Sequence, residues 1–380
     1  MEPGPPTRTE LLTGTPVWMV RRHADVRQVL TDPRLGRAEL YAPNAPLLTP
    51  YPNLTDAPDG LLNLDGPEHQ RLRRTVQRAF TPRAIARWRP WVASVVEELL
   101  DALSTAERPV DLVAAVGRPL PVAVISRLMG LDGVDFERLS RWSDQALSTS
   151  AYTPQEVMTA MREFGEFAGQ LVAERRGKPT DDLVSSLVQA ADQDGEVTEP
   201  QIVTLVVGLV VAGHETTITS LGNALVYLLD ENRTAWHALA DSEERAGAVA
   251  EQLLRAVPLG DRNVTPGLLR RAVADVEIGG VLISAGDVVA ADTFAANHDP
   301  ETYPGDWRTS LFEPPATPHL TFGAGPHHCL GAWLARMELE LALHRLARRL
   351  PGLRLAVPVE QLAWRTGLLT RSPQSLPVTW

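Results

Sequence analysis

The stretch from Thr321 to Gly331 constrains this chain most. It reads Thr-Phe-Gly-Ala-Gly-Pro-His-His-Cys-Leu-Gly and leads into a helical pattern that begins at Ala332. Its Cys329 is the single cysteine of the 380 residues. Glycines let the backbone approach a flat partner closely, and the amides and dipole at the start of the following helix favour a thiolate. Most free cysteines are small buried hydrophobes, but this position predicts a site for anionic sulfur.

The spacing within this stretch is specific. The pattern Phe-Gly-x-Gly-x-His-x-Cys-x-Gly, followed by Ala-x-x-Leu-Ala-Arg-x-Glu-Leu, resembles the haem-ligand loop of the cytochrome P450 family. All six fixed positions are matched, by Phe322, Gly323, Gly325, His327, Cys329 and Gly331. The resemblance implies that Cys329 is the axial ligand of the iron in haem b (iron protoporphyrin IX), and that Phe322, Gly323, His327 and Gly331 belong to the cofactor site. A thiolate ligand pushes electron density through the iron and favours O–O cleavage.

Composition narrows the class of protein. With 44% hydrophobic and 22% charged residues, the chain is globular and long enough to enclose a cofactor. The net charge of −11 argues against a nucleic-acid partner. One cysteine excludes an intrachain disulfide and a four-cysteine zinc site. The N-terminus has no signal pattern and the longest apolar run, 202–212, is too short to span a bilayer, so we expect a cytoplasmic protein that does not enter a membrane.

The periodicity is mainly helical. Strand patterns occur at Val17–Val20 and on both sides of Gly279-Gly280, whereas 83–187 is helical throughout and 199–229 is the longest helical pattern. We expect a flexible leader over 1–14 and a single domain over 15–380. The fold class is therefore mainly α with small β-sheets. The resemblance, which extends from Val17 to Trp380, implies the triangular, helix-rich cytochrome P450 fold, with haem between the long central helix and the helix after Cys329.

Cationic and donor residues from distant parts of the chain match the family's haem-propionate ligands. His69 and Arg73 are four residues apart and so project from one face of a helix that opens near Pro67. Alone, they would be read as a solvated basic surface. Beside the cysteine loop, the pair resembles the family's Pro-Glu-His-x-x-x-Arg helix. The resemblance implies that His69, Arg73, Arg270 and His327 converge on the anionic edge of haem.

Polar residues interrupt the long apolar helix at 212–217, Ala-Gly-His-Glu-Thr-Thr. Threonine hydroxyls can simply bond the preceding turn's carbonyl, but an acid in an apolar helix needs a reason. The six residues resemble the family's Ala-Gly-x-Glu/Asp-Thr-Thr, where the helix bulges over haem. The resemblance implies that Glu215 and Thr216 are the catalytic acid–alcohol pair that brings protons to dioxygen. His214 is expected to pack away from the iron.

Two departures from the family pattern offset each other. The family's next helix carries a buried glutamate three residues before an arginine; here Gln252 precedes Arg255, and Pro314 stands where the family usually has a second arginine. Removing both members of a buried ion pair can be nearly neutral. We expect compensation, with Glu251 facing elsewhere or reaching Arg255 as a surface pair.

The resemblance implies a haem-thiolate monooxygenase that hydroxylates, or otherwise oxidises, a small organic molecule. Because the chain has no flavin or iron–sulfur motif, two electrons would come from a ferredoxin and its reductase. Gly-Pro-His-x-Cys and the Leu-Pro-Val-Thr-Trp ending are most similar to enzymes of secondary metabolism. A basic docking face is expected from arginines on two helices: Arg71, Arg74, Arg78, Arg345, Arg348 and Arg349. Such arginines are usually solvated surface.

The substrate pocket is expected under the 37–64 loop. Its predicted wall residues lie on the long helix, in 257–264 and near the C-terminus: Val207, Val211, Ala212, Thr216, Arg262, Leu368, Leu369 and Thr370. The alternative within the same chemistry is oxidative coupling of aromatic rings. From other classes, a haem-binding sensor or carrier would not need Glu215 and Thr216, and a catalytically silent protein that activates a partner would not need Cys329.

Overall fold

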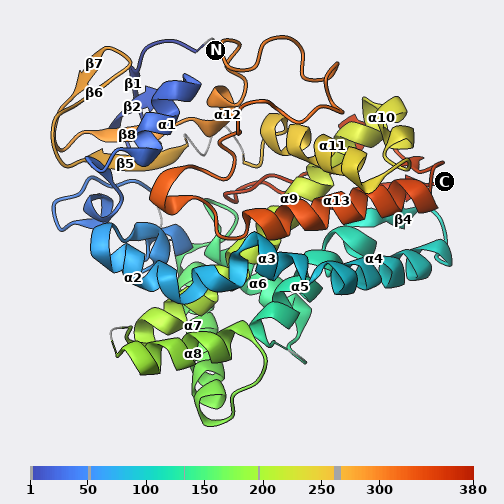
Figure 1. Ribbon diagram of the computed structural model, residues 1–380, viewed down its shortest axis with the longest axis horizontal. Coiled ribbons are helices and arrows are strands. Elements are labelled where there is room, and N and C mark those ends of the chain that lie inside the picture. The colour runs from blue at the N-terminus through green and yellow to red at the C-terminus, as the bar shows by residue number, and fades with distance from the viewer. Residues whose placement is uncertain (1–2, 50–52, 132, 196, 261–266) are drawn as a thin grey trace.

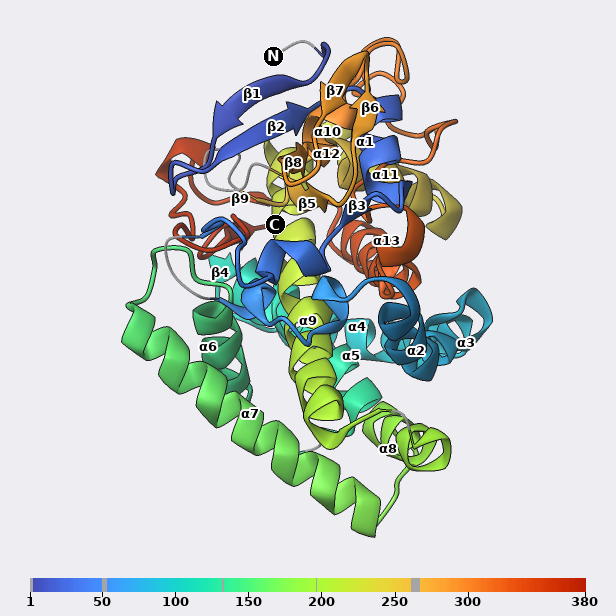
Figure 2. The same ribbon diagram turned by 90° about the vertical axis from the view of Figure 1, so that its left-hand side faces the viewer.

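Helix α9 (Glu199–Asp230) runs through the middle of the molecule, and the other long helices surround it (Figures 1 and 2). A capping box fixes its start, since the Thr198 hydroxyl accepts from the Gln201 amide and the Gln201 side chain accepts from Thr198 N–H. It packs against α5 (Pro119–Met129), α7 (Pro154–Gly177) and α13 (Ala332–Arg349). Among the described residues, α9 is the one helix with the length and composition to cross a membrane, but most of that apolar stretch is buried in the core.

This computed structural model describes residues 3–49, 53–131, 133–195, 197–260 and 267–380. The predicted fold class is confirmed, because helices dominate and the sheets are small. The remaining α-helices are α1 (His23–Thr31), α2 (Gly66–Gln77), α3 (Pro82–Ala86), α4 (Arg89–Ser104), α6 (Phe136–Ala146), α8 (Leu183–Asp194), α10 (Arg233–Ala238), α11 (Glu243–Ala256) and α12 (Thr293–Ala296). Short helical turns are η1 (Ala38–Tyr41), η2 (Leu54–Asp56), η3 (Leu61–Asn63), η4 (Arg78–Phe80), η5 (Val113–Gly117, a π-helical turn), η6 (Gly325–His327) and η7 (Val359–Gln361).

The strands gather on the side of the molecule away from α7 and α8 (Figure 2). The largest sheet has the order β1 (Thr7–Glu10), β2 (Pro16–Val20), β8 (Val288–Ala291), β5 (Leu268–Ala272) and β3 (Leu35–Gly36), and only β2 and β8 pair in parallel. A second sheet joins β4 (Val110–Asp111), β10 (Pro377–Thr379) and β9 (Arg354–Leu355). The hairpin of β6 (Val276–Ile278) and β7 (Val281–Ile283) is separate.

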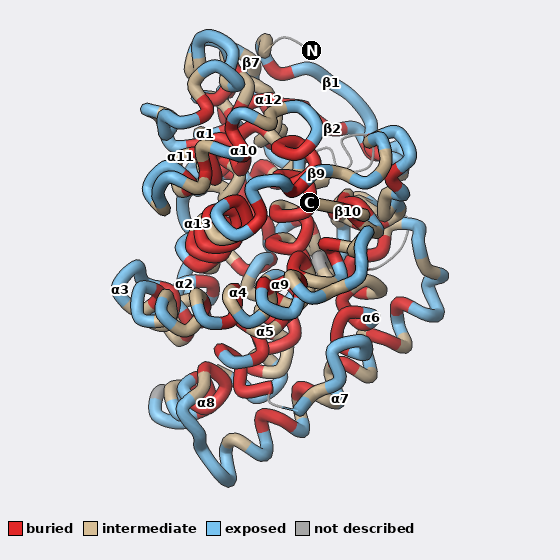
Figure 3. Tube along the Cα trace, turned by 90° about the vertical axis from the view of Figure 1, so that its right-hand side faces the viewer, coloured by how far each residue is buried: buried red, intermediate tan, exposed pale blue. Residues whose placement is uncertain are grey.

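The main apolar core lies among α4, α5, α9, α11 and α13. Figure 3 shows α9 and α13 largely buried, whereas α7 alternates buried and exposed turns as a helix on the surface does. A second core lies between α1 and the large sheet, with Val26, Val29 and Val289 fully buried. The turn η6, just before α13, lies against the end of α1, where a β-carbon at Gly325 would meet the Leu30 carbonyl.

The leader expected over 1–14 contains β1, which pairs with β2 from Thr7 to Glu10 through backbone ladder bonds although its side chains are exposed. The long helix predicted over 199–229 is present as α9. It stays α-helical through the polar residues 212–217, so the bulge that the family resemblance implies there does not break the helix. The predicted turn at Gly279-Gly280 is confirmed between β6 and β7, and both glycines are in the left-handed region (φ 54° and 81°). Arg270 lies outside this hairpin, on β5 of the large sheet.

Candidate active site

The cysteine loop is a tight turn closed by its own backbone. Cys329 N–H donates to the Phe322 carbonyl at 2.9 Å, and Gly323 and Gly325 adopt left-handed φ angles of 69° and 67°. A side chain at Gly325 would also meet the Leu30 carbonyl of α1 at 2.8 Å, so only glycine fits there. At Gly331, a β-carbon would sit 4.0 Å from the Cys329 sulfur. These glycines bring the backbone close around the thiol.

The environment of Cys329 favours ligation. Burial raises the pKa of the Cys329 thiol, while backbone N–H groups of Gly331 and Ala332 and the guanidinium groups of Arg73 and Arg336 act in the opposite direction. The residue nevertheless has exposed surface. Both hold because protein atoms crowd around the sulfur on one side and leave the other side open. A thiol that is hydrogen-bonded from behind and open in front is suited to bind a metal in front.

His69 of α2 and His327 of the cysteine loop lie in contact, with ring centroids 4.3 Å apart and ring planes tilted by 41°. His327 Nε2 lies 3.3 Å from an Asp65 carboxylate oxygen, and the other Asp65 oxygen accepts from the backbone N–H groups of Arg37 (2.6 Å) and Ala38 (2.7 Å). The Nε2 atom of His69 is buried and lacks a partner among the described residues. Burial, helped by His327 and Arg73, lowers the pKa of His69 to about 4, so the ring is neutral at pH 7.

Two arginines are buried next to these histidines. Arg270 is 3% exposed and donates to the neighbouring Leu269 carbonyl (2.8 Å), and burial lowers its pKa to about 9. Arg37 is 5% exposed, and it donates to the Asn63 side chain (2.7 and 3.0 Å). The Asp65 carboxylate favours the charged form of both arginines and so raises the pKa of each, against the effect of burial. We name Arg37, Asp65, His69, Arg270 and His327 the haem-edge cluster.

The haem-edge cluster fits a cofactor with two carboxylates. Two buried guanidinium groups face one aspartate and an unpartnered imidazole nitrogen, and such an excess of buried positive charge is costly unless anions compensate it. The structure brings together His69, Arg270 and His327 as predicted. Arg73 lies one turn further along α2 and donates to the His328 carbonyl at 2.6 Å, so it contacts the cysteine loop. The residues present therefore suit haem b, with its propionates at the cluster and its iron at Cys329.

One stripe of α9 remains open although the helix is central. Thr204, Gly208, Ala212, Thr216 and Ser220 recur every four residues, and each keeps accessible surface, with Ala212 classed as exposed. The 37–64 loop reaches this helix, because a β-carbon at Gly60 would lie 3.8 Å from the Thr204 methyl group. Accessible surface along a core helix, beneath a loop, indicates space for a ligand.

The structure separates the predicted acid and alcohol. The Glu215 carboxylate is 2% exposed and accepts from Arg365 at 2.6 Å; Arg365 also pairs with Asp144 of α6. Burial raises the pKa of Asp144 to about 6, although Arg365 opposes this. We name Asp144, Glu215 and Arg365 the acid cluster. It ties together α6, α9 and the C-terminal segment.

Thr216 and His214 bond to their own helix. The Thr216 hydroxyl donates to the Ala212 carbonyl at 2.9 Å, which leaves its lone pairs free to accept a hydrogen bond. His214 Nδ1 lies 2.7 Å from the Val210 carbonyl and the ring is fully buried, as expected for a residue that packs in the core. The hydroxyl is therefore placed to accept from, and so orient, a proton donor.

The predicted substrate residues divide into two groups. Val207, Val211 and Leu368 are buried in the protein, at 5%, 1% and 5% exposure, whereas Ala212 is exposed and Leu369 is partly exposed. The open stripe thus contains the residues that directly follow the two predicted valines, Gly208 and Ala212. Arg262 lies outside the described residues. The C-terminal segment joins the turn after α6, since Leu369 N–H donates to the Leu147 carbonyl at 2.9 Å.

The departures at Gln252 and Pro314 are compensated. Arg255 Nε donates to the Gln252 side-chain oxygen at 2.9 Å, its guanidinium binds the Asn297 carbonyl, and its carbon Cζ lies 4.6 Å from the Tyr303 ring centroid. The Gln252 amide donates in turn to the Glu313 carbonyl at 2.6 Å. Glu251 faces elsewhere, as predicted, and pairs with Arg336 at 2.5 Å. A neutral amide and a backbone carbonyl replace the missing charges.

Sequence reasoning missed four residues of these clusters: Arg37, Asp65, Asp144 and Arg365. Their partners within the two clusters are 28 to 262 residues away along the chain. A buried glutamate in an apolar helix does demand a cation, so the existence of a partner for Glu215 was inferable. Its identity as Arg365 was not, because nothing local marks that residue.

Known proteins share this arrangement. The cytochrome P450 family model matches residues 261–351. The chain is 43% identical over 99% of its length to nocardicin C N-oxygenase from Nocardia uniformis subsp. tsuyamanensis, of which it covers 92%. It is 42% identical over its whole length to mycinamicin IV hydroxylase/epoxidase from Micromonospora griseorubida, of which it covers 93%.

A solved structure agrees with these relatives. The crystal structure of cytochrome P450mel 107F1, described as having biaryl coupling reactivity, superposes with a TM-score of 0.90 at 35% identity, over 99% of this chain and 93% of the other. The relatives are bacterial haem enzymes that oxidise their substrates, and they cover nearly all of the chain. With the cysteine loop, the haem-edge cluster and the fold in agreement, the chain belongs to the cytochrome P450 family and is a haem b monooxygenase.

Proposed function

We propose that this enzyme inserts oxygen into a small secondary-metabolite intermediate, using two electrons from a ferredoxin and its reductase in the cytoplasm. The observation that carries the proposal is the accessible thiol of Cys329 on the same loop as His327 of the haem-edge cluster, in a protein whose central helix α9 keeps an open stripe. Haem b held by these groups supplies the iron chemistry that activates dioxygen. Relatives named for oxygenation of antibiotics support the substrate class.

The chain's own residues bind the cofactor and handle protons. Cys329 is the iron ligand, while His69, Arg270 and His327 bind the propionates and Arg73 braces the cysteine loop. Phe322, Gly323 and Gly331 shape the loop around the thiolate. Thr216 orients a proton donor through its free lone pairs, and Glu215 relays protons from solvent. Because Glu215 is bonded to Arg365, it can relay a proton inward only after it leaves that ion pair.

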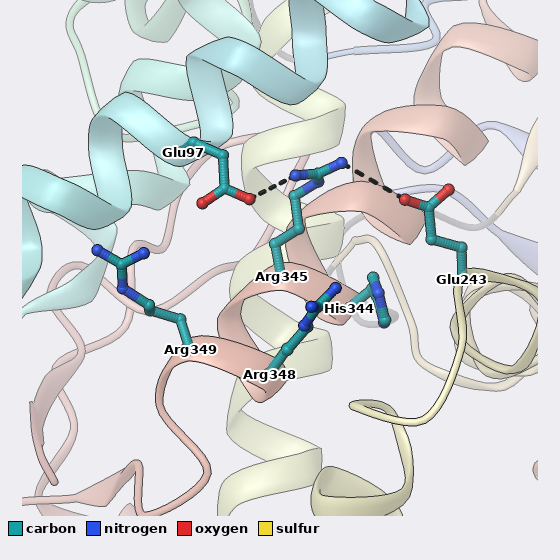
Figure 4. Close-up of a pocket in the computed structure, with 6 residues that line it drawn as sticks. All are labelled: Glu97, Glu243, His344, Arg345, Arg348 and Arg349. Carbon is teal, nitrogen blue, oxygen red and sulfur yellow. Dashed lines mark hydrogen bonds and ion pairs between the residues drawn. The ribbon is translucent and has the colours of Figure 1, made fainter.

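The electron donor docks on α2 and α3, in this proposal. Arg74, Arg78, Arg83 and Arg87 are exposed there, and none of these four has an ion pair within the described residues. Two of the arginines at the far end of α13 differ: Arg345 pairs with Glu97 and Glu243, and Arg349 pairs with Asp101, whereas Arg348 is exposed and has no ion pair within the described residues (Figure 4). Because Arg345 and Arg349 are largely neutralised, we place the docking face on the α2 side and not at this end of α13. Arg78→Glu should slow reduction by ferredoxin more than Arg349→Glu does.

Oxidative coupling of aromatic rings is the second candidate. It is favoured by one observation, the similarity to a structure described as having biaryl coupling reactivity. Both reactions use the same haem centre, so they are distinguished by products: hydroxylation adds one oxygen atom to one substrate, whereas coupling joins two rings and adds none.

The test of the haem-thiolate site is spectroscopic. The reduced carbonyl complex of the purified protein should show the red-shifted Soret band of thiolate ligation, and Cys329→Ser should lose it completely. His328→Ala, a change at the adjacent residue that leaves the thiolate in place, is the matched control and should keep the shifted band. An unshifted band in fresh wild-type protein would contradict the assignment of Cys329.

A further inference from the structure

Asn223 lies on α9 seven residues beyond Thr216, about 10 Å along the helix axis. Its side-chain amide nitrogen donates to the Pro258 carbonyl at 3.1 Å and to the Arg371 carbonyl at 2.9 Å. Because carbonyl oxygens only accept, the amide must point its nitrogen toward them and its oxygen away. One side chain thus holds the segment after α11 and the C-terminal segment on the same helix.

These two segments also meet each other at this point. Arg371 N–H donates to the Leu259 carbonyl at 3.0 Å. The helix lies close against the C-terminal segment, since a β-carbon at Gly222 would come within 3.4 Å of the Pro373 ring. The spacing between residues 257–259 and 369–371 is therefore set where both rest on α9, and Asn223 is the polar bridge there.

Asn223 also lines a small cavity. Its Oδ1 atom is buried and lacks a partner among the described residues. The cavity has a volume of about 10 Å³ and a mainly apolar lining, to which Ser220 and Thr321 add hydroxyl groups. That volume is about what one buried water needs, and a water there would donate to Oδ1. Ser220 belongs to the open stripe of α9, so the bridge is continuous with the face that carries Thr216.

We propose that Asn223 is a specificity-determining positioning residue: by bridging the Pro258 and Arg371 carbonyls it fixes the distance between two walls of the substrate pocket. The inference rests on the proposed function, because it takes residues 257–259 and 368–370 as pocket walls. Asn223 touches neither substrate nor haem. It acts through the walls, and the buried water completes its hydrogen bonds without entering the reaction.

The test compares two azoles of different size that bind haem iron, imidazole and 4-phenylimidazole, titrated by absorbance into the holoenzyme. Imidazole is too small to need the walls, so its dissociation constant should stay within twofold in Asn223→Ala. 4-Phenylimidazole needs preordered apolar walls, and ordering loosened walls costs affinity. We expect it to bind about fivefold to tenfold more weakly in Asn223→Ala, and by an intermediate factor in Asn223→Ser, which keeps one donor.

Asn232→Ala is the matched control. Asn232 also makes two side-chain hydrogen bonds, to Tyr227 and to Ala235 N–H at the start of α10, but away from the predicted pocket walls. It should lower the melting temperature without changing the ratio of the two dissociation constants. A ratio within twofold of wild type in Asn223→Ala, or a larger change in Asn223→Ser than in Asn223→Ala, overturns the inference. Failure of the proposed function would look different, because wild-type protein would then lack the haem-thiolate spectrum before any azole is added.

Discussion

The haem-edge cluster and the acid cluster are both buried and charged, but only one of them is complete. The haem-edge cluster has two arginines against one aspartate and leaves His69 Nε2 without a partner. In the acid cluster, one arginine serves two carboxylates, and each charged group has an ion pair. A buried cluster that lacks counter-charge indicates a ligand. A complete cluster indicates a group that must break a contact before it can act.

The largest effect is expected from replacing Arg270 of the haem-edge cluster. Arg270→Met removes a buried cation that we expect to bind a haem propionate, and a hydrogen bond to a charged group contributes roughly 1.5–3 kcal/mol. Haem should therefore leave the protein roughly ten to a hundred times faster, as measured by transfer to apomyoglobin. The melting temperature of the variant should change much less than its rate of haem loss.

Arg271→Met is the matched control for Arg270. Arg271 is adjacent on β5 and so points to the opposite face of the sheet, where it donates to the Gly286 and Glu39 carbonyls. Its replacement should leave haem release within twofold of wild type. Equal haem release from the two variants would mean that the excess positive charge at the haem edge does not bind the cofactor.

Thr216→Ala tests whether the open stripe of α9 takes part in proton delivery. The variant should keep haem and electron consumption but divert most reducing equivalents to hydrogen peroxide, because no hydroxyl remains to orient the proton donor. Peroxide formed per reducing equivalent is the measurement. Thr217→Ala is the control, since this buried neighbour is turned about 100° around the helix. Wild-type coupling in Thr216→Ala would assign proton delivery to another group, such as a substrate hydroxyl.

Local motifs predicted the cofactor half of the site far better than the substrate half. The cysteine loop is eleven consecutive residues, and its glycines, thiol and following helix can be interpreted without knowing the rest of the fold. His69, Arg270 and His327 were found because each sits in a recognisable short pattern. Asp144, Arg365 and Asn223 carry no such pattern. Their roles depend on which strand end or helix turn lies opposite, and only tertiary packing decides that.

The same limit explains the errors near α9. The motif at 212–217 implied a bulge, but α9 is α-helical through these residues, and Thr216 and His214 bond to carbonyls of the preceding turn. Periodicity places Val207 and Val211 on the helix but cannot say which stripe faces a ligand. The open stripe lies where the 37–64 loop, which is remote in sequence, reaches the helix at Thr204.

Asp144→Asn tests the acid cluster through the pH dependence of protein stability. The pKa of Asp144 is raised to about 6, so the folded protein holds this proton more tightly than the unfolded chain does. Wild-type stability from this group is therefore lost as pH rises from about 4 to 6.5, and is constant above. Asp144→Asn has no carboxyl group to titrate there and so lacks that loss. The melting temperature of wild type minus that of the variant should therefore fall by a few degrees between pH 4 and pH 6.5.

Only the difference between the two proteins is informative here. His69, whose pKa is lowered to about 4, acts in the opposite sense, but equally in both proteins. Asp192→Asn is the control, because its ion pair with Arg176 is on the surface. A difference between wild type and Asp144→Asn that is independent of pH would mean that Asp144 is already ionised at pH 4 and that the acid cluster is held by charge alone.

The smallest effect is expected at Gln252. This residue and Arg255 satisfy their hydrogen bonds without a buried carboxylate. Gln252→Glu restores the residue that the family usually has, and a carboxylate would bind Arg255 more strongly than the amide oxygen does. The same change removes the amide N–H donors to the Glu313 and Ser310 carbonyls and places negative charge against both oxygens. In the family an arginine would face that charge; here the position is Pro314.

Because gain and loss are of similar size, the melting temperature of Gln252→Glu should stay within about 1 °C of wild type or fall. A clear rise would show that Arg255 lacks counter-charge in the native protein, and that this cluster resembles the haem edge more than the acid cluster.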